Sequence, residues 1–374
     1  MKGFNHIDKL LTSLSDRGIT PGSELSVYYH GENVFRGCYG YDDEKLERKT
    51  SRNTVYTLYS MTKAVTTCAI MKLIEEGKLG LDDPVSKYLP EYGEMKVIRD
   101  GELLPCRRKM TLRHVLSMQG GLDYDVCSPY ITGENKRRSG RATTRQIVRA
   151  ISEKPLLFEP GTDYLYSLCL DVAAAVAEEA IGVRFRDYVK DLIIRPLGIA
   201  DMAYHREEMS DPSRIAFEWD AHFTFDEKPP PCEVNHYGNY VPSPEYDSGG
   251  AGLVGTCDAY MKFADAVVRG EILDKRTVAM WHENRLCEKA LATYRAGKPE
   301  YGYGLGVRIF TDERRPALMN EFGWDGAAGS YVMMDEVNEI AAVYTQSVLA
   351  CPQAFRDVHP VVRDCVYKEL LNAD

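Results

Sequence analysis

The sequence predicts an α+β (α/β) fold in which an antiparallel sheet, built from both ends of the chain, is flanked by helices and carries a mainly helical insertion. Three observations favour it: strand patterns near the N-terminus, further strand patterns near the C-terminus, and helical patterns over most of the residues between them. We expect a single unit over 1–374, in which 1–78 and 301–374 form an α/β subdomain and 79–300 a helical subdomain with loops.

The first part of the chain alternates between helical and extended patterns. A His-Gly-Glu turn that begins at His30 predicts a hairpin, and Gly77 ends a helical run. Asp83 followed by Pro84 is a helix-start signal. The elements predicted here are strands over 24–29 and 33–40, an extended segment over 55–59 and a helix over 64–74, and residues 4–14 show an amphipathic pattern that contains charges.

Helical periodicity dominates as far as Met202, and strand patterns return at Tyr301. Between them, residues 229–255 are rich in Pro, Gly and Tyr, and long loops inside compact proteins are often functional. The clearest predicted elements are helices over 113–118, 145–151, 171–181 and 185–193, strands over 304–310, 317–322, 329–334 and 340–345, and a final helix over 354–371.

Charge and hydropathy exclude several classes of partner. A net charge of −10 argues against nucleic acid or an anionic membrane, and no apolar run approaches the roughly 18 residues that span a bilayer. The N-terminus lacks the basic start, apolar core and cleavage site of an export signal. We therefore expect a cytoplasmic protein with a small-molecule partner, whose oligomeric state the sequence leaves open.

The cysteines and histidines give no support for a disulfide framework or a metal site. Ten cysteines are scattered along the chain without a Cys-x-x-Cys pair, so we expect reduced thiols. The eight histidines form no His-Glu-x-x-His or comparable cluster. We accordingly predict no metal ion and no cofactor.

The tetrad Ser60-Met61-Thr62-Lys63 stands where the extended segment gives way to a helix. Residues three apart share a helical face, so the Lys63 amine is expected to reach the Ser60 hydroxyl. The partly positive helix start favours negative charge at Ser60 and disfavours a charged Lys63. A serine beside a neutral lysine is a candidate nucleophile with its own base, although a serine before a helix is most often a simple cap.

Three separated stretches resemble the serine β-lactamase and penicillin-binding-protein-like superfamily, in particular its class C-like branch and the family VIII carboxylesterases. Phrases that support the resemblance lie at 112–116, 195–198 and 248–253, and the match runs in the family's order from about Asn53 to Gln346. The three stretches are Ser60-x-x-Lys63, Tyr164-Leu165-Tyr166-Ser167 and Phe322-Gly323-Trp324-Asp325-Gly326-Ala327-Ala328-Gly329.

The resemblance implies a β-lactamase/transpeptidase-like fold and a set of catalytic residues. Ser60 corresponds to the acylated serine, Lys63 to the lysine that activates it, and Tyr166 to the tyrosine of the family's Tyr-x-Asn element. The N–H groups of Ser60 and Ala327 would form the oxyanion hole. Whether Lys63 or Tyr166 takes the first proton stays open, because a tyrosine serves as a base only beside positive charge.

Two departures from the family's β-lactamases favour an ester substrate. Leu168 stands where they have Asn, and Trp324-Asp325-Gly326 replaces their Lys-Thr-Gly, so a buried amide and a cation are lost. A substrate carboxylate would be left unpaired, and Asp325 would repel it. Family esterases resemble this chain in having Trp and Gly at the third motif.

The remaining candidates for substrate contact each have a structural alternative. Trp324 is either a pocket wall or ordinary core, and Asp325 could instead cap a turn or pair with an arginine. Tyr237, Tyr240 and Tyr246 could line a substrate gate or pack within their loop.

The sequence thus predicts a serine hydrolase that cleaves a small carboxylic ester through an acyl-Ser60 intermediate. One alternative is an acyltransferase that passes the same acyl group to an alcohol or amine. Another is a β-lactamase or D-amino-acid peptidase that binds its substrate by other groups. A non-catalytic scaffold is the last, although it would be expected to have lost Ser60, Lys63 or Tyr166.

Overall fold

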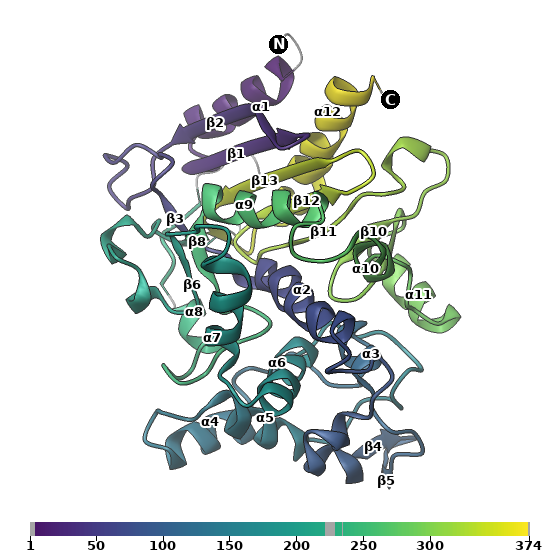
Figure 1. Cartoon of the computed structure of the whole chain (residues 1–374). Helices are drawn as coiled ribbons and strands as arrows, with labels where there is room; N and C mark the ends of the chain where they lie inside the picture. Colours follow the sequence, from purple (N-terminus) through teal and green to yellow (C-terminus); the bar gives the residue numbers. More distant parts are fainter. Residues whose placement is uncertain (1–3, 221–228, 234, 373–374) are drawn as a thin grey trace.

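The computed structural model describes residues 4–220, 229–233 and 235–372 and is built around a seven-stranded antiparallel sheet (Figure 1). The strand order is β2-β1-β13-β12-β11-β10-β9, so N-terminal strands pair directly with C-terminal ones. The strands are β1 Gly22–Tyr29, β2 Glu32–Gly40, β9 Tyr301–Tyr303, β10 Arg308–Phe310, β11 Phe322–Asp325, β12 Tyr331–Asp335 and β13 Ile340–Gln346. The prediction of a sheet built from both ends of the chain is confirmed.

Helices cover both faces of this sheet. On one face, α1 (Asn5–Asp16) and α12 (His359–Leu371) pack together, and on the other α9 (Cys257–Val268) lies across β1, β12 and β13 (Figure 1). Successive side chains of β13 enter the two layers in turn, Ala342 with α1 and α12 and Val343 with α9. The helix α9 thus belongs to the layers of the sheet, although it falls within the predicted helical range of 79–300.

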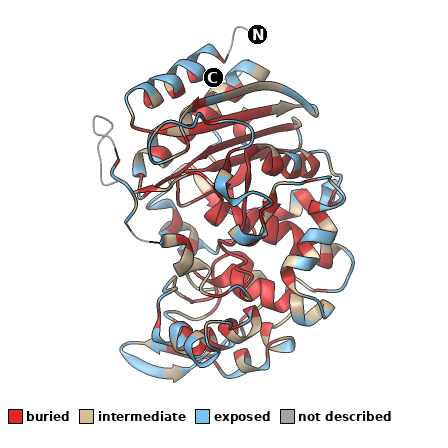
Figure 2. Cartoon of the chain, turned by 90° about the vertical axis from the view of Figure 1, so that its left-hand side faces the viewer, coloured by how far each residue is buried: buried red, intermediate tan, exposed pale blue. Residues whose placement is uncertain are grey.

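The helical part of the chain lies beside the sheet, with α2 (Thr62–Glu75) between the two (Figure 1). α6 (Cys169–Ile181) packs on α2, α3 and α5. Figure 2 shows buried residues in the sheet and in the helices next to it, and exposed residues on the outer helices and loops. The other α-helices are α3 Leu112–Leu116, α4 Pro129–Arg137, α5 Thr144–Ser152, α7 Phe185–Val189, α8 His236–Tyr240, α10 Lys275–Trp281 and α11 Glu288–Arg295.

Small sheets hold the segments that lead into the site. The three-stranded sheet β3-β8-β6 and the N–H of Leu58, which donates to the Leu253 carbonyl at 3.0 Å, fix the approach to Ser60. The short strands are β3 Val55–Thr57, β4 Lys96–Arg99, β5 Glu102–Pro105, β6 Met202–Ala203, β7 Trp219–Asp220, β8 Val254–Thr256 and β14 Val348–Leu349. Parallel pairing joins β14 to β7, and β4 pairs with β5.

Three local predictions were wrong. The strand predicted over 304–310 begins only at Arg308. Asp83 and Pro84 start no α-helix: a 3-10 turn over Val85–Lys87 follows them, and the Asp83 carboxylate accepts instead from the N–H of Gly80 and from Tyr88. The strand predicted over 317–322 begins only at Phe322, because a 3-10 turn over Pro316–Leu318 precedes it. Helical single turns of the 3-10 or π type also occur at Tyr59–Met61, Pro90–Glu94, Lys190–Ile194, Arg206–Glu208, Pro212–Arg214 and Ala354–Val358.

Candidate active site

Ser60 lies in a tight 3-10 turn, Tyr59–Met61, directly before α2. Tyr59 has a φ of 45°, a left-handed conformation that costs a non-glycine residue roughly 1 kcal/mol or more. The tyrosine hydroxyl is held by the Glu218 carboxylate at 2.8 Å. No side chain caps either helical segment, so Ser60 is not the helix cap that a serine at this place could have been.

Lys63 is fully buried one helical turn away from Ser60. Its Nζ lies 3.1 Å from Ser60 Oγ, 2.8 Å from the Gly250 carbonyl oxygen and 3.2 Å from the Tyr124 hydroxyl. All three partners are uncharged, so no hydrogen-bonded carboxylate stabilises an ammonium group here. Burial lowers the pKa of Lys63 to about 7, although the nearby Asp171 carboxylate acts in the opposite direction.

Tyr166 approaches Ser60 from the other side. Its hydroxyl lies 2.7 Å from Ser60 Oγ and accepts from the Trp324 indole N–H at 3.1 Å, while its ring lies under Lys63 Nζ. Burial raises the pKa of Tyr166 above its ordinary value, although the hydrogen bonds with Ser60 and Trp324 act against it. At neutral pH this tyrosine therefore keeps its proton.

The protons of the site can be assigned from its donors. Trp324 is a donor only, so Tyr166 accepts from it and directs its own O–H toward Ser60 Oγ. A neutral Lys63 has two N–H groups, which suit the Gly250 carbonyl and the Tyr124 oxygen. Its lone pair is left for the Ser60 O–H. In this arrangement the serine proton points at a base and a second proton donor already contacts Oγ.

Two residues of the site were missed by sequence reasoning. Tyr124 stacks on Tyr166 with its ring centroid at 5.1 Å and binds Lys63, yet it stands in a loop without a motif. Asp171 is fully buried, and its Oδ1 accepts from Tyr246 at 2.6 Å and Ser248 at 2.8 Å. The supporting phrase at 248–253 was the one signal that could have pointed to this carboxylate.

Gly250 gives Lys63 room to approach Asp171. A Cβ atom at residue 250 would lie 2.7 Å from Asp171 Oδ2 and 3.3 Å from Lys63 Nζ. Any side chain there would push between the amine and the carboxylate. The glycine is therefore required by close packing.

The turn after β11 reaches the backbone beside Ser60. Gly326 passes so close to Leu58 that a Cβ would lie 2.6 Å from the Leu58 carbonyl oxygen. Within the turn, Gly326 and Gly329 make backbone hydrogen bonds. Among the described residues, the Ala327 N–H donates to no backbone acceptor, and Ser60 stands in the first turn of its helical segment, where N–H groups lack an intrahelical partner. Both are thus available to a ligand, as an oxyanion hole requires.

Trp324 and Asp325 point to opposite sides of β11. The Trp324 ring stacks on Tyr166 with centroids 5.5 Å apart and forms a wall of the site. The Asp325 carboxylate is instead bound by Arg308 at 2.8 Å and Lys298 at 3.0 Å. Burial opposes ionisation, but these two cations lower the pKa of Asp325 below its ordinary value. The structure does not bring this carboxylate to Ser60. Asp325 pairs with an arginine instead, which was the alternative to substrate contact.

Of the three predicted loop tyrosines, Tyr240 lies at the site, whereas Tyr237 and Tyr246 are part of the packed interior. Tyr240 lies edge-on to Tyr59 and Tyr124, with centroids at 5.7 and 5.9 Å. Tyr237 and Tyr246 are buried, and their hydroxyls bind protein groups. Leu168 is buried beneath Tyr240, where both line a small cavity. Contact of Leu168, Tyr240 or Gly326 with substrate stays a prediction.

The comparisons with known proteins concern the family and the fold of this chain. The sequence profile described as Beta-lactamase matches residues 7–357. The chain belongs to the beta-lactamase family. Esterase EstB of Burkholderia gladioli is 29% identical over 272 residues, which cover 66% of this chain and 65% of that protein.

Solved structures of the same fold cover almost the whole chain. The hydrolase EstCE1, described as having promiscuous acyltransferase activity, is 26% identical with a TM-score of 0.78 and covers 96% of this chain and 97% of that one. Simvastatin synthase (LovD) from Aspergillus terreus is 21% identical with a TM-score of 0.81, covering 97% and 98%. At that identity it shows the fold alone.

These findings confirm the predicted resemblance and the β-lactamase/transpeptidase-like fold, and this beta-lactamase-family chain is a serine hydrolase. The esterase and acyltransferase relatives support ester hydrolysis or acyl transfer. Within the described part of the chain, no helix combines the length and apolar character that a membrane span needs. Among the residues that the structure describes, one group of possible metal ligands is found, Asp220, Cys232 and His236, and it does not include Ser60, Lys63 or Tyr166.

Proposed function

We propose that this family member hydrolyses small carboxylic esters through an acyl-Ser60 intermediate. One observation carries the proposal: Ser60 Oγ lies between a buried amine at 3.1 Å and a buried phenol at 2.7 Å. With the pKa of Lys63 near 7 and that of Tyr166 above its ordinary value, the pair supplies a base and an acid at the same pH.

Acylation begins when neutral Lys63 takes the Ser60 proton and Oγ attacks the ester carbonyl carbon. The carbonyl oxygen becomes an oxyanion, which the N–H groups of Ser60 and Ala327 stabilise by roughly 3 kcal/mol per donor. When the C–O bond breaks, Tyr166 gives its proton to the departing alkoxide, and the proton held by Lys63 restores Tyr166. The free alcohol leaves, and Ser60 carries the acyl group.

Deacylation repeats these steps with water in place of the serine hydroxyl. Lys63 is neutral again and takes a proton from the attacking water, whose oxygen adds to the acyl carbon. The tetrahedral intermediate collapses with release of Ser60 Oγ, which receives a proton from Tyr166. The carboxylic acid then leaves, and the proton on Lys63 returns to Tyr166.

The walls of the site favour an ester over a β-lactam or a peptide. Leu168 and Trp324 offer no amide or cation to such a substrate. The cation beside the indole, Lys298, is 5.2 Å from the Trp324 ring but is already paired with Asp325. A substrate carboxylate would therefore enter without a free counter-charge, at the cost of its desolvation.

Acyl transfer is the second candidate, and EstCE1 favours it. That hydrolase has promiscuous acyltransferase activity by its description and is 26% identical across 96% of this chain. Aromatic rings surround Ser60 and would hold an apolar alcohol next to the acyl group. In that reaction the alcohol O–H gives its proton to Lys63 in place of water, and the product is a new ester.

The test compares wild type, Ser60→Ala and the control Ser152→Ala, whose hydroxyl binds only the Arg149 carbonyl among the described residues. We expect turnover of short p-nitrophenyl esters that falls at least about 10³-fold in Ser60→Ala and is unchanged in the control. A fluorophosphonate should add mass at Ser60. Ester turnover that survives Ser60→Ala would overturn the proposal.

Substrate choice is measured in the same assay with a chromogenic cephalosporin and with added primary alcohols. Esters cleaved faster than the cephalosporin support the esterase, and the reverse order supports the β-lactamase or peptidase alternative. New ester formed at the expense of free acid supports acyl transfer. A chain that takes no label at Ser60 and turns over none of these substrates would be the non-catalytic scaffold.

A further inference from the structure

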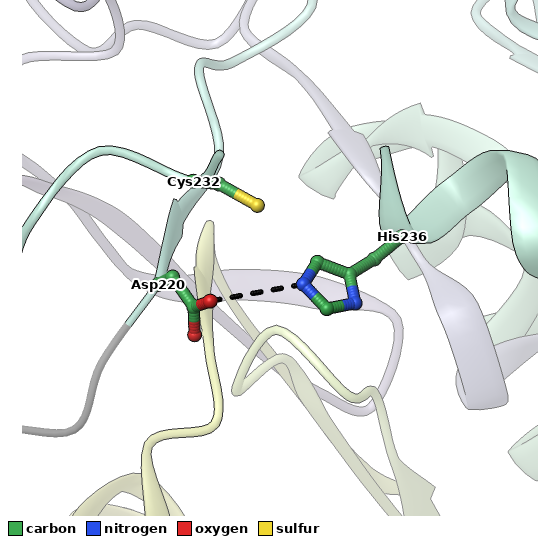
Figure 3. A group of neighbouring side chains, drawn as sticks. All are labelled: Asp220, Cys232 and His236. Atoms are coloured by element: carbon green, nitrogen blue, oxygen red, sulfur yellow. Dashed lines mark ion pairs between the residues drawn. The ribbon is translucent and has the colours of Figure 1, made fainter. Parts of the chain in front are cut away.

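Three side chains with metal-binding atoms converge outside the catalytic cluster. Figure 3 shows the Asp220 carboxylate, the Cys232 sulfur and the His236 imidazole turned toward a common space. Their nearest ligand atoms all lie within 4.8 Å of one another, and Asp220 Oδ2 is 3.7 Å from His236 Nε2. The hydrogen-bond partners described above for the side chains of Ser60, Lys63 and Tyr166 are one another, Tyr124, Gly250 and Trp324.

Backbone pairing places the three donors. Asp220 ends β7, and its N–H donates to the Pro230 carbonyl at 3.0 Å, while the Cys232 N–H donates to the Glu218 carbonyl at 3.1 Å. The carboxylate and the thiol are thus brought together by paired backbone. Asn235 accepts from the Gly238 N–H and caps α8, which places His236 at the first helical residue.

One ring nitrogen of His236 lacks a hydrogen-bond partner among the described residues. His236 Nε2 is inaccessible to solvent and has no hydrogen-bond partner among the described residues. The 3.7 Å to Asp220 exceeds hydrogen-bonding distance. A buried ring nitrogen without a partner is costly, and native structures rarely leave one. A metal ion between the nitrogen and the carboxylate would satisfy both.

The donor set selects the kind of ion. A thiolate and an imidazole favour zinc over magnesium or calcium, which prefer oxygen ligands. Tetrahedral zinc with bonds of about 2.0–2.3 Å separates its ligand atoms by about 3.3–3.7 Å. The donors therefore need only small movements to close on an ion. We infer that Asp220, Cys232 and His236 form a zinc site whose fourth position is open to water.

The ion would fix the segment that lies over the candidate active site. It would join β7, residue 232 and the start of α8, and α8 ends at Tyr240, which packs against Tyr59 and Tyr124. Just before β7, Glu218 holds the Tyr59 hydroxyl next to Ser60. This zinc is structural, because the acylation chemistry proposed above runs entirely through Lys63 and Tyr166.

The site was not predicted from the sequence because its spacing matches no common motif. Eleven residues separate Asp220 from Cys232 and three separate Cys232 from His236. Only the pairing of β7 with the chain around Pro231 brings the aspartate back to the other two.

Metal binding is tested on the whole chain, stripped with a chelator, reloaded with zinc and dialysed. We expect one zinc per wild-type chain, lost in Cys232→Ser and in His236→Gln and retained in the exposed-cysteine control Cys287→Ser. Cobalt(II) should give a thiolate charge-transfer band and tetrahedral visible bands that Cys232→Ser abolishes. Saturating zinc should raise the Tm of wild type by about 3 °C and leave that of His236→Gln unchanged.

Equal zinc content in wild type and both ligand variants would overturn the site, and so would wild type that retains no zinc. The latter result would leave Asp220 and His236 as a simple ion pair. Circular dichroism shows whether each variant is folded. Asp220→Asn should still bind zinc at lower affinity, which separates loss of a ligand from loss of the fold. Zinc content and Tm of Ser60→Ala should match those of wild type. The test of the zinc site is therefore independent of the proposed esterase chemistry.

Discussion

Two basic side chains, Lys63 and Arg308, are both buried, but they differ in their hydrogen-bond partners and in the direction of their pKa shift. Among the described residues Lys63 hydrogen-bonds only to uncharged groups, and burial lowers its pKa to about 7. Arg308 is bound by the carboxylates of Glu321 at 2.7 Å and Asp325 at 2.8 Å. Burial acts to lower the pKa of Arg308, but these carboxylates hold it well above its ordinary value.

The difference in partners separates a reactive group, Lys63, from a group that stabilises the structure, Arg308. A buried cation with two carboxylates stays charged at all relevant pH values and cannot exchange protons with a substrate. A buried amine without a hydrogen-bonded carboxylate sits near its midpoint at neutral pH and can take a proton. The same strand serves both, since Trp324 donates to Tyr166, whose ring lies under Lys63, and its neighbour Asp325 binds Arg308.

Removing the Lys63 amine should abolish activity and leave the stability of the fold unchanged. In Lys63→Met a side chain of similar length fills the space without a base, so we expect kcat/KM for ester hydrolysis to fall about 10³-fold or more. The free energy of unfolding should be unchanged or slightly higher, because a costly buried amine is gone. Steady-state kinetics and urea unfolding measure the two effects, and a large loss of stability would contradict this account of Lys63.

Removing Arg308 should instead destabilise the fold. Arg308→Met leaves Glu321 and Asp325 buried without their counter-charge, which should cost about 3–5 kcal/mol of unfolding free energy. The control Arg314→Met removes an exposed arginine whose one ion pair within the described residues is with Asp312, and it should cost less than about 1 kcal/mol. Urea titrations of both variants give the difference. Equal midpoints for the two would mean that the Arg308 cluster is not structural.

Gly250→Ala should disturb the balance at Lys63 without removing any catalytic atom. Its Cβ would press on both Asp171 and Lys63, and displacement of a catalytic group by a fraction of an ångström should lower kcat/KM about tenfold or more. Gly133→Ala is the matched control, because a Cβ there has only a distant arginine nitrogen at 4.0 Å. If both variants retain wild-type kcat/KM, close packing at residue 250 does not matter.

Trp324→Phe should produce the smallest effect, since it keeps an aromatic wall but removes the N–H that binds Tyr166. Loss of one hydrogen bond of about 1 kcal/mol predicts a fall of about fivefold in kcat/KM. The loss should appear in acylation by substrates with poor leaving groups, for which protonation by Tyr166 matters most. A uniform effect across good and poor leaving groups would argue for a packing role alone.

The fold was predictable where local pattern and pairing agree. Strands β1 and β2 and helix α12 match their sequence patterns within a few residues. The pattern failed over 317–322, where apolar residues form a 3-10 turn, because strand β11 depends on the register of its partner β12. Such pairing is a tertiary choice that a window of sequence does not contain.

The site was predictable where residues are local or carried by a motif. Ser60 and Lys63 meet because they are three apart at a helix start, and Tyr166 was found by its motif. Tyr124 and Asp171 come from a loop and a helix that only folding brings to Lys63. Asp325 was expected either to contact substrate or to pair with an arginine, and it pairs with Arg308. The sequence could not decide, because the two faces of a strand are distinguished only by what packs on each.

The pH dependence of kcat/KM for a p-nitrophenyl ester, in wild type and Asp171→Asn, tests the central claim most directly. Below its pKa Lys63 is protonated and cannot take the Ser60 proton, so the rate should rise with pH to a plateau with a midpoint near 7. Asp171 favours the charged amine, so its neutralisation should move this midpoint to lower pH. A profile without a step near neutral pH, or one that Asp171→Asn leaves in place, would contradict neutral Lys63 as the base.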